Sequence, residues 1–132
     1  MRIFIIEDDH LRLNYLINQL DFEKDSIHVG HSVEEALKMW QPPYNLVLFD
    51  HDLGGRTYVG SEDKNTGAEF ARLLVHNKPG LYDLAQYFIV HSYNPDGAKN
   101  IVAILAQAGI QADYIPFGPT LVKRINYLKT TL

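Results

Sequence analysis

Two short acidic clusters contain the residues of this chain that are best suited to chemistry. Glu7-Asp8-Asp9 follows the apolar run Ile3–Ile6, and Asp50-His51-Asp52 follows the apolar run Leu46–Phe49. Short, continuous, apolar runs of this kind are typical of strands buried in a parallel sheet. Ligands bind an open α/β sheet at the edge where its strands end. Several carboxylates on that edge repel one another unless a cation or a proton lies among them. The two clusters therefore predict a metal site.

The donor atoms narrow the choice of metal. Carboxylates are hard oxygen donors that suit Mg²⁺ or Mn²⁺, and we expect the ligands to come from Asp8, Asp9, Asp50 and Asp52. Imidazole from His51 would widen the choice to Fe, Ni²⁺ or Zn²⁺. On an extended segment Asp50 and Asp52 share one face and His51 takes the other. All three can face inward only if the chain turns after the strand, and Gly54-Gly55 follows closely.

Strand-like and helix-like segments alternate along the chain and must position these clusters. Further apolar runs lie at Tyr87–Val90 and Tyr114–Ile115, with a weaker one at Ile27–Val29. Apolar residues at helical spacing cover Leu13–Leu20, Val33–Trp40, Phe70–Leu74, Ala98–Leu105 and Leu121–Leu128. Ser32 with Glu35, and Thr66 with Glu69, have the spacing of capping boxes, and Gly109 stands where a glycine would end a helix.

This alternation predicts an α/β fold. Five βα units give a parallel sheet with right-handed crossovers, doubly wound in the flavodoxin-like order 2-1-3-4-5. In that order the first and third strands are neighbours, so Asp8, Asp9 and Asp50 would converge. We expect residues 1–132 to form a single domain, since this length suits one hydrophobic core.

Composition excludes several classes of protein. The net charge of −4, from 12 basic and 16 acidic residues, argues against a broad surface for duplex DNA, although a nucleotide or an RNA end needs only a local basic loop. The absence of cysteine rules out disulfides and thiolate metal sites. We see neither a signal peptide nor an apolar run long enough to span a bilayer, so we expect a cytoplasmic protein without a membrane partner.

The chain resembles the CheY-like receiver domain of two-component response regulators over essentially its whole length. Asp8 and Asp9 resemble the acidic pair after the first strand, and Asp50 occupies the phospho-acceptor position. Gly67 resembles the glycine that opens the third helix. Ser92 stands where the fourth receiver strand usually ends in Thr or Ser. Tyr114-Ile115-Pro116-Phe117 resembles the end of the fifth strand.

The chain departs from the common receiver pattern at several positions. Receivers normally have a lysine before Pro-Phe, and Ile115 stands there instead. That lysine normally pairs with the phosphoryl group. Further differences from the common receiver pattern are the strings Asp50-His51-Asp52 and His91-Ser92 and a long loop over 54–66. With these strings the chain is most similar to the divergent cyclic-phosphate-processing receiver branch. The resemblance implies hydrolysis or processing of a cyclic phosphate, in RNA repair or biological conflict systems.

The resulting hypothesis is a metal-dependent phosphoesterase acting on a phosphate-containing small molecule or an RNA end. Asp50, His51 and His91 are the expected catalytic residues, since imidazole titrates near neutral pH. The expected phosphate or substrate ligands are Ser92, Asn94, Arg56 and Lys64. Purely structural roles are open for several of them: Asp9 and Asn94 as helix caps, Asp52 in a turn, and both histidines in the interior.

Two other functions fit the same sequence. The chain could be an atypical stand-alone receiver that is phosphorylated on Asp50 although the lysine is missing. It could also be a pseudo-receiver that acts only by binding a protein partner, in which case the acidic residues would be dispensable.

Overall fold

The protein alternates five strands with five helices. The computed structural model describes residues 1–20, 25–76 and 84–131. The elements are β1 (Arg2–Ile6), α1 (His10–Asn18), β2 (Ser26–Gly30), α2 (Val33–Met39), β3 (Tyr44–Phe49), α3 (Gly67–His76), β4 (Ala85–Val90), α4 (Pro95–Gln107), β5 (Ala112–Tyr114) and α5 (Pro119–Thr131). No helix within these ranges is long and apolar enough to cross a membrane.

The strands form one parallel sheet in the order β2-β1-β3-β4-β5. The predicted fold class and strand order are therefore confirmed. β1 and β3 are direct neighbours, with Ile6 opposite Phe49, and β3 lies beside β4, with Phe49 opposite Val90. The three strand ends are thus level, which matters for the residues that follow them.

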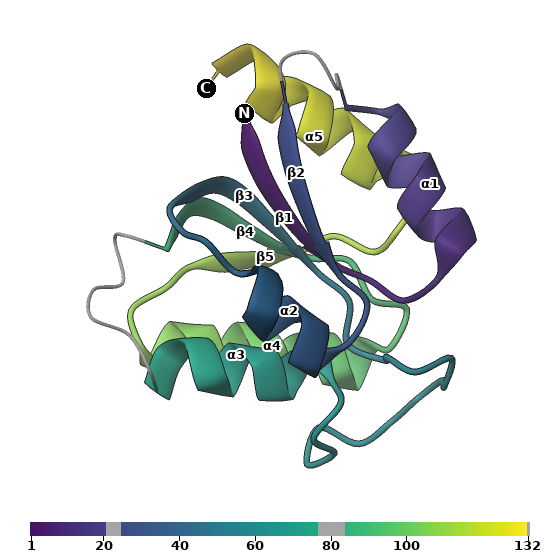
Figure 1. Ribbon diagram of the computed structural model, residues 1–132, viewed down its shortest axis with the longest axis vertical. Coiled ribbons are helices and arrows are strands. Elements are labelled where there is room, and N and C mark those ends of the chain that lie inside the picture. The colour runs from purple at the N-terminus through teal and green to yellow at the C-terminus, as the bar shows by residue number, and fades with distance from the viewer. Residues whose placement is uncertain (21–24, 77–83, 132) are drawn as a thin grey trace.

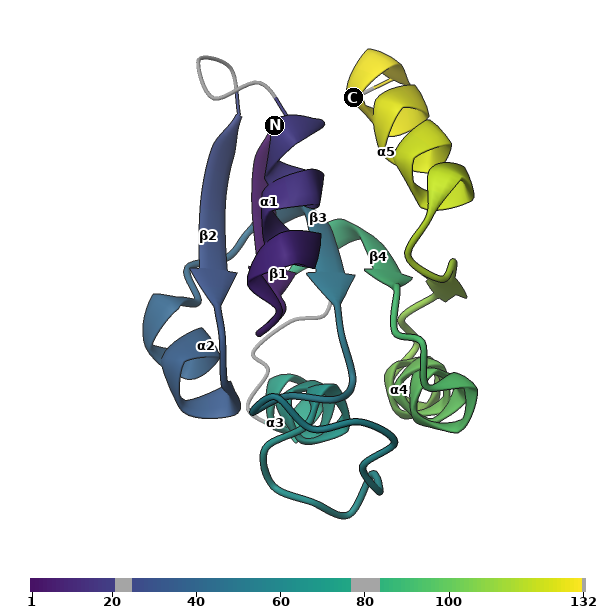
Figure 2. The same cartoon turned by 90° about the vertical axis from the view of Figure 1, so that its right-hand side faces the viewer.

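Helices cover both faces of the sheet (Figures 1 and 2). Phe4 and Ile6 of β1 pack into a core shared with α2, α3 and α4, and Ile3 and Ile5 pack into a second core with α1 and α5. Successive side chains of a strand point to opposite faces, so a strand covered on both sides must be apolar throughout. This explains why the β1 and β3 runs show no polar alternation.

Local signals fix the helix boundaries that the sequence predicts. The Ser32 hydroxyl accepts a hydrogen bond from the Glu35 N–H at 3.1 Å, and Thr66 Oγ1 accepts one from the Glu69 N–H at 3.2 Å. Gly109 lies at φ 81°, and the Ile110 N–H reaches the Leu105 carbonyl at 2.9 Å, which closes α4 as a Schellman motif.

The segment between β3 and α3 extends beyond the carboxyl edge of the sheet (Figure 2). An antiparallel bridge between Asp52 and Thr66 closes its two ends. Gly67 opens α3 directly against β3, because its N–H donates to the His51 carbonyl at 2.9 Å and a Cβ there would collide with the Asp50 carbonyl oxygen. We call residues 53–65 the β3–α3 loop.

Candidate metal centre

Three ionisable side chains lie side by side at the carboxyl ends of β1, β3 and β4. Glu7, Asp50 and His91 each directly follow the last residue of their strand. Backbone hydrogen bonds continue one step past the strands, from the Asp50 N–H to the Ile6 carbonyl and from the His91 N–H to the Phe49 carbonyl, both at 2.9 Å. The level register therefore places the three residues in one row, which we call the acid–histidine row.

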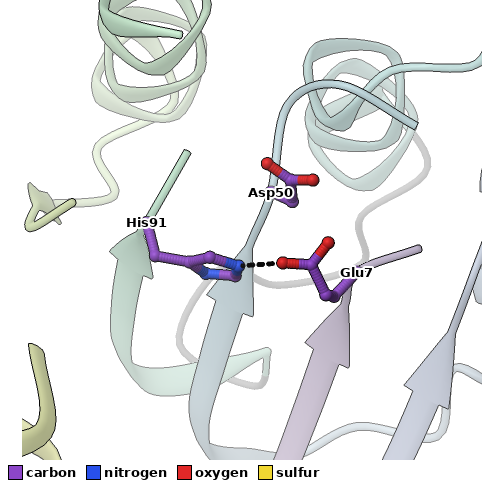
Figure 3. Close-up of side chains that lie close together, drawn as sticks. All are labelled: Glu7, Asp50 and His91. Atoms are coloured by element: carbon purple, nitrogen blue, oxygen red, sulfur yellow. Dashed lines mark hydrogen bonds and ion pairs between the residues drawn. The ribbon is translucent and has the colours of Figure 1, made fainter. Parts of the chain in front are cut away.

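The row is almost completely buried. Glu7, Asp50 and His91 expose 0 %, 2 % and 1 % of their surface. His91 Nε2 lies 3.1 Å from Glu7 Oε1 (Figure 3). A carboxylate only accepts hydrogen bonds, so Nε2 carries the hydrogen of this pair. Over the residues that the structure describes, His91 Nδ1 is a buried ring nitrogen without a hydrogen-bond partner.

Arg12, in the first turn of α1, supplies the positive charge beside the two acids. Its Nε lies 2.9 Å from Glu7 Oε1, its Nη2 lies 3.1 Å from Glu7 Oε2, and the same Nη2 lies 3.4 Å from Asp50 Oδ2. The pairing with Glu7 is a two-point contact, which is the strong geometry for arginine and a carboxylate. Asp50 is held much more loosely.

The two carboxyl groups differ in charge state for this reason. Burial opposes ionisation of Glu7, but hydrogen bonds from His91 and Arg12 hold the pKa of Glu7 well below its usual range. Burial and the adjacent negative charge of Glu7 raise the pKa of Asp50 to about 9. Without a further cation, the buried row is stable with one carboxylate and one neutral carboxyl group.

The donor set fits a divalent cation. One ligand atom from each of Glu7, Asp50 and His91 can be chosen so that all lie within 4.8 Å of one another. Two carboxylates and an imidazole suit Mn²⁺, Fe²⁺ or Zn²⁺, and the carboxylates alone suit Mg²⁺. The burial of two acids side by side, which raises the pKa of Asp50, favours the binding of a further cation at this row. The acid–histidine row is therefore the candidate metal site of this protein.

A cavity of about 360 Å³ lies against this row. That volume is within the range of roughly 300–1,000 Å³ found for small-molecule sites. Asp50 and Arg12 belong both to the row and to the cavity wall. The other lining residues are Asp52, Arg56, Thr57, Tyr58, Ser92 and Tyr93. The predicted residues Asp50, Asp52, Arg56 and Ser92 are thus brought together.

Asp8 and Asp9, predicted as metal ligands, have other contacts in the structure. Asp8 Oδ2 accepts a hydrogen bond from the Gly55 N–H at 2.6 Å, which ties the β3–α3 loop to the end of β1. Burial raises the pKa of Asp8, and the bond from Gly55 partly offsets the increase. Asp9 caps α1 by accepting from the Arg12 N–H at 2.9 Å. Their metal-binding roles stay predictions, and neither belongs to the acid–histidine row.

Asp52 and His51 anchor the loop. Asp52 accepts hydrogen bonds from the Tyr58 N–H at 2.6 Å, from the Val59 N–H at 3.2 Å and from Asn94 Nδ2 at 3.1 Å. His51 Nδ1 lies 2.7 Å from Asp52 Oδ1, and its Nε2 lies 2.9 Å from Ser61 Oγ. Although burial opposes it, these contacts lower the pKa of Asp52. Both carboxylate oxygens of Asp52 therefore already accept hydrogen bonds.

His51 is completely buried, and a Cβ at Gly97 of α4 would collide with its ring. Both of its ring nitrogens are occupied, the first by Asp52 and the second by Ser61. The geometry gives His51 a positioning role for the loop, and its predicted catalytic role stays a prediction.

The predicted phosphate ligands separate into two groups. Ser92 and Arg56 line the cavity. Asn94 caps α4 by accepting from the Gly97 N–H at 3.0 Å, while its amide also holds Asp52. Lys64 lines a different hollow, on the side of α2. The structure therefore does not bring Lys64 to the cavity beside Asp50.

Glu7 and Arg12 are the candidate site residues that the sequence analysis did not select. Glu7 stands directly after Ile6 as Asp50 stands after Phe49, but this signal selects Glu7 only once the register of β1 and β3 is known. The signal for Arg12 is weaker: it is a cation in the first turn of the helix that follows an acidic strand end.

Solved structures of response-regulator receivers share this fold. A CheY-like response regulator receiver from Methanospirillum hungatei is 24 % identical, with a TM-score of 0.64 and coverage of 98 % of this chain and 94 % of that one. The HemR receiver domain from Leptospira biflexa is 22 % identical, with a TM-score of 0.67, covering 98 % and 91 %. The response regulator TrrA from Thermotoga maritima, solved with Mg²⁺-BeF, is 20 % identical, with a TM-score of 0.64, covering 99 % and 98 %.

The sequence itself gives the finer assignment. Residues 3–107 match the family described as "Cyclic-phosphate processing Receiver domain". The chain belongs to this family, as the Asp50-His51-Asp52 and His91-Ser92 strings predicted. No curated protein matches the chain.

Proposed function

We propose that this chain processes a cyclic phosphate ester of a nucleotide or an RNA end, with a divalent cation held by Glu7, Asp50 and His91. The observation that carries the proposal is the position of Asp50, which is shared between the buried acid–histidine row and the wall of a ligand-sized cavity. The family's description points in the same direction.

Several residues of the chain have separate roles in this proposal. The bound cation would polarise the phosphate and lower the pKa of a water molecule. Arg12 lines the cavity beside Asp50, so its positive charge would attract the non-bridging phosphate oxygens. Ser92 lines the cavity next to His91. Glu7 is oriented by His91 and by the Asp8 and Asp9 N–H groups, at 3.0 and 3.1 Å from Oε2.

The proposed reaction is hydrolysis. The water oxygen forms a bond to phosphorus, and one of the two ester P–O bonds breaks. Asp50 is assigned to proton transfer, because its Oδ2 has only the 3.4 Å contact with Arg12. Asp50, ionised when it helps to hold the cation, would take a proton from the attacking water, and the ribose oxygen that leaves would take a proton from solvent. The product is a phosphate monoester with a free neighbouring hydroxyl.

Turnover of nucleoside 2′,3′-cyclic phosphates and of RNA with a cyclic phosphate end tests the proposal. The purified protein with Mn²⁺ or Mg²⁺ should release monoesters, and Asp50→Asn and Glu7→Gln should each lose at least about 100-fold in rate. Asp113→Asn, an exposed carboxylate paired with Arg124, is the matched control and should retain the wild-type rate. An inactive wild-type protein that nevertheless binds Mn²⁺ would rule out the activity and leave the metal site standing.

One observation favours a second candidate function, phosphorylation of Asp50. The position before Pro116 is Ile115, and Arg12 supplies a cation beside Asp50 instead. A phosphoryl group on Asp50 would thus still find a positive partner. Incubation with acetyl phosphate, followed by mass spectrometry, should then detect an adduct in the wild type and none in Asp50→Asn. An unmodified wild-type protein contradicts this candidate.

A further inference from the structure

Two exposed tyrosine rings belong to the wall of the same cavity as Asp50 and Arg12. Tyr58 exposes 75 % of its surface and Tyr93 exposes 55 %, and both line the 360 Å³ space. Large aromatic rings are normally buried at least in part, so two that stay exposed around one cavity call for an explanation. They come from different segments, the β3–α3 loop and the connection between β4 and α4.

Tyr58 is held in place at a cost to folding. Its φ is 52°, in the left-handed region that side chains other than glycine seldom adopt. Its N–H donates to Asp52 Oδ2 at 2.6 Å, and the next residue, Val59, is fixed on both sides by Asp52 and by Asn94. Backbone strain that surrounding contacts enforce is found most often at ligand-binding sites. Here the strain serves no packing purpose, because the ring remains in solvent.

Tyr93 is oriented by its neighbours. The guanidinium carbon of Arg12 lies 5.8 Å from the centre of its ring, and Phe117 packs edge-on with ring centres 6.2 Å apart. Arg12 thereby connects this ring with the acid–histidine row. The wall of one cavity thus combines groups for an anion with two aromatic faces.

We propose that Tyr58 and Tyr93 form a nucleobase platform, so that the substrate is a nucleoside cyclic phosphate or the terminal nucleotide of an RNA. This inference rests on the proposed function for the phosphate end and adds the recognition of the base. Stacking on tyrosine accepts any base, because every base has a π face. The platform therefore predicts similar affinities for substrates with any of the four bases. It also predicts that a substrate with a base binds more tightly than one without a base.

The test compares two probes with the same phosphate. Binding of adenosine 2′-monophosphate and of ribose 2-phosphate, which are products of the proposed hydrolysis with and without a base, is measured by calorimetry with Mn²⁺ present, so that binding is separated from turnover. We expect the probe with the base to bind about 5- to 100-fold more tightly to the wild type. Tyr58→Ala and Tyr93→Ala should each reduce this ratio, and Tyr58→Phe should keep it. Tyr127→Ala, on the exposed face of α5, is the matched control.

A further variant separates the platform from a purely structural role. Tyr58→Gly removes the ring and relieves the positive φ, so it should raise the thermal midpoint while the preference for the base falls. Equal binding of both probes to the wild type would overturn the platform and leave the proposed phosphate chemistry intact. Preference for the base without any turnover would support the platform and count against the proposed activity.

Discussion

At the scale of single residues, Arg12 decides how the buried acids are neutralised. Its side chain is 26 % exposed, whereas that of Glu7 is fully buried, so the guanidinium reaches the row from the solvent side. A divalent cation at the same row would lie close to this guanidinium. Arg12 therefore stabilises the metal-free protein and at the same time repels the metal.

Replacement of Arg12 by glutamine should have opposite effects on folding and on metal binding. The variant leaves Glu7 buried without its charged partner, so we expect the free energy of unfolding in EDTA to fall by about 3 kcal/mol. Because a positive charge is removed, Mn²⁺ should bind about tenfold more tightly or better. Urea denaturation and Mn²⁺ titration measure the two effects.

Arg124→Gln is the control, since the pair between Arg124 and Asp113 is exposed on both sides. It should change stability by less than about 1 kcal/mol and leave Mn²⁺ affinity unaltered. Equal losses of stability in the two variants would show that Arg12 is an ordinary surface residue.

At the scale of elements, the β3–α3 loop is tied to three strand or helix ends. Asp8 after β1 holds Gly55, Asp52 after β3 holds Tyr58 and Val59, and Asn94 before α4 holds the Val59 carbonyl. Loops of this length are often functional. Arg56, Thr57 and Tyr58 of this anchored loop belong to the cavity wall, so Asp8 and Asp52 help to shape the site.

Asp52→Asn should loosen the loop while the sheet stays intact. An amide nitrogen replaces one carboxylate oxygen and faces an N–H donor, so the bonds to Tyr58 or Val59 weaken. We expect amide exchange at these two positions to accelerate about tenfold or more, with β1 and β3 unchanged. Hydrogen exchange followed by NMR measures this.

Glu62→Gln, in the same loop, is the matched control, because Glu62 is an exposed carboxylate. Its exchange pattern should equal that of the wild type. Unchanged protection of Tyr58 and Val59 in Asp52→Asn would mean that the loop does not depend on this anchor.

At the scale of the whole molecule, the fold followed from the sequence more completely than the site did. Apolar runs alternating with helical faces leave few topologies, and capping residues such as Ser32 and Thr66 mark where helices start. The site depends on register. Because side chains alternate along a strand, a shift of one residue exchanges Glu7 for Asp8 in the row. Periodicity locates the strand end within a residue or two, which is too coarse to choose between neighbouring acids.

The charge state of the buried row makes the stability of the metal-free protein depend on pH. The pKa of Asp50 in the folded state, about 9, is far above its ordinary value of 3.8. Between these values the native state binds a proton that the unfolded chain has released. Stability therefore decreases as pH rises across this window. The pKa of Glu7 is lowered instead, so its contribution is present above its ordinary value and is lost on acidification.

In EDTA we therefore expect the thermal midpoint to fall as pH rises from about 5 to about 9, and Asp50→Asn should largely abolish this slope. Asp113→Asn, an exposed carboxylate, should keep the wild-type slope. Mn²⁺ replaces the proton at the row, so it should raise the midpoint more at pH 8 than at pH 5.5 in the wild type and little in Asp50→Asn. The same slope in wild type and Asp50→Asn would show that Asp50 is already ionised in the folded protein. Arg12 alone would then have to compensate the negative charges of both Glu7 and Asp50.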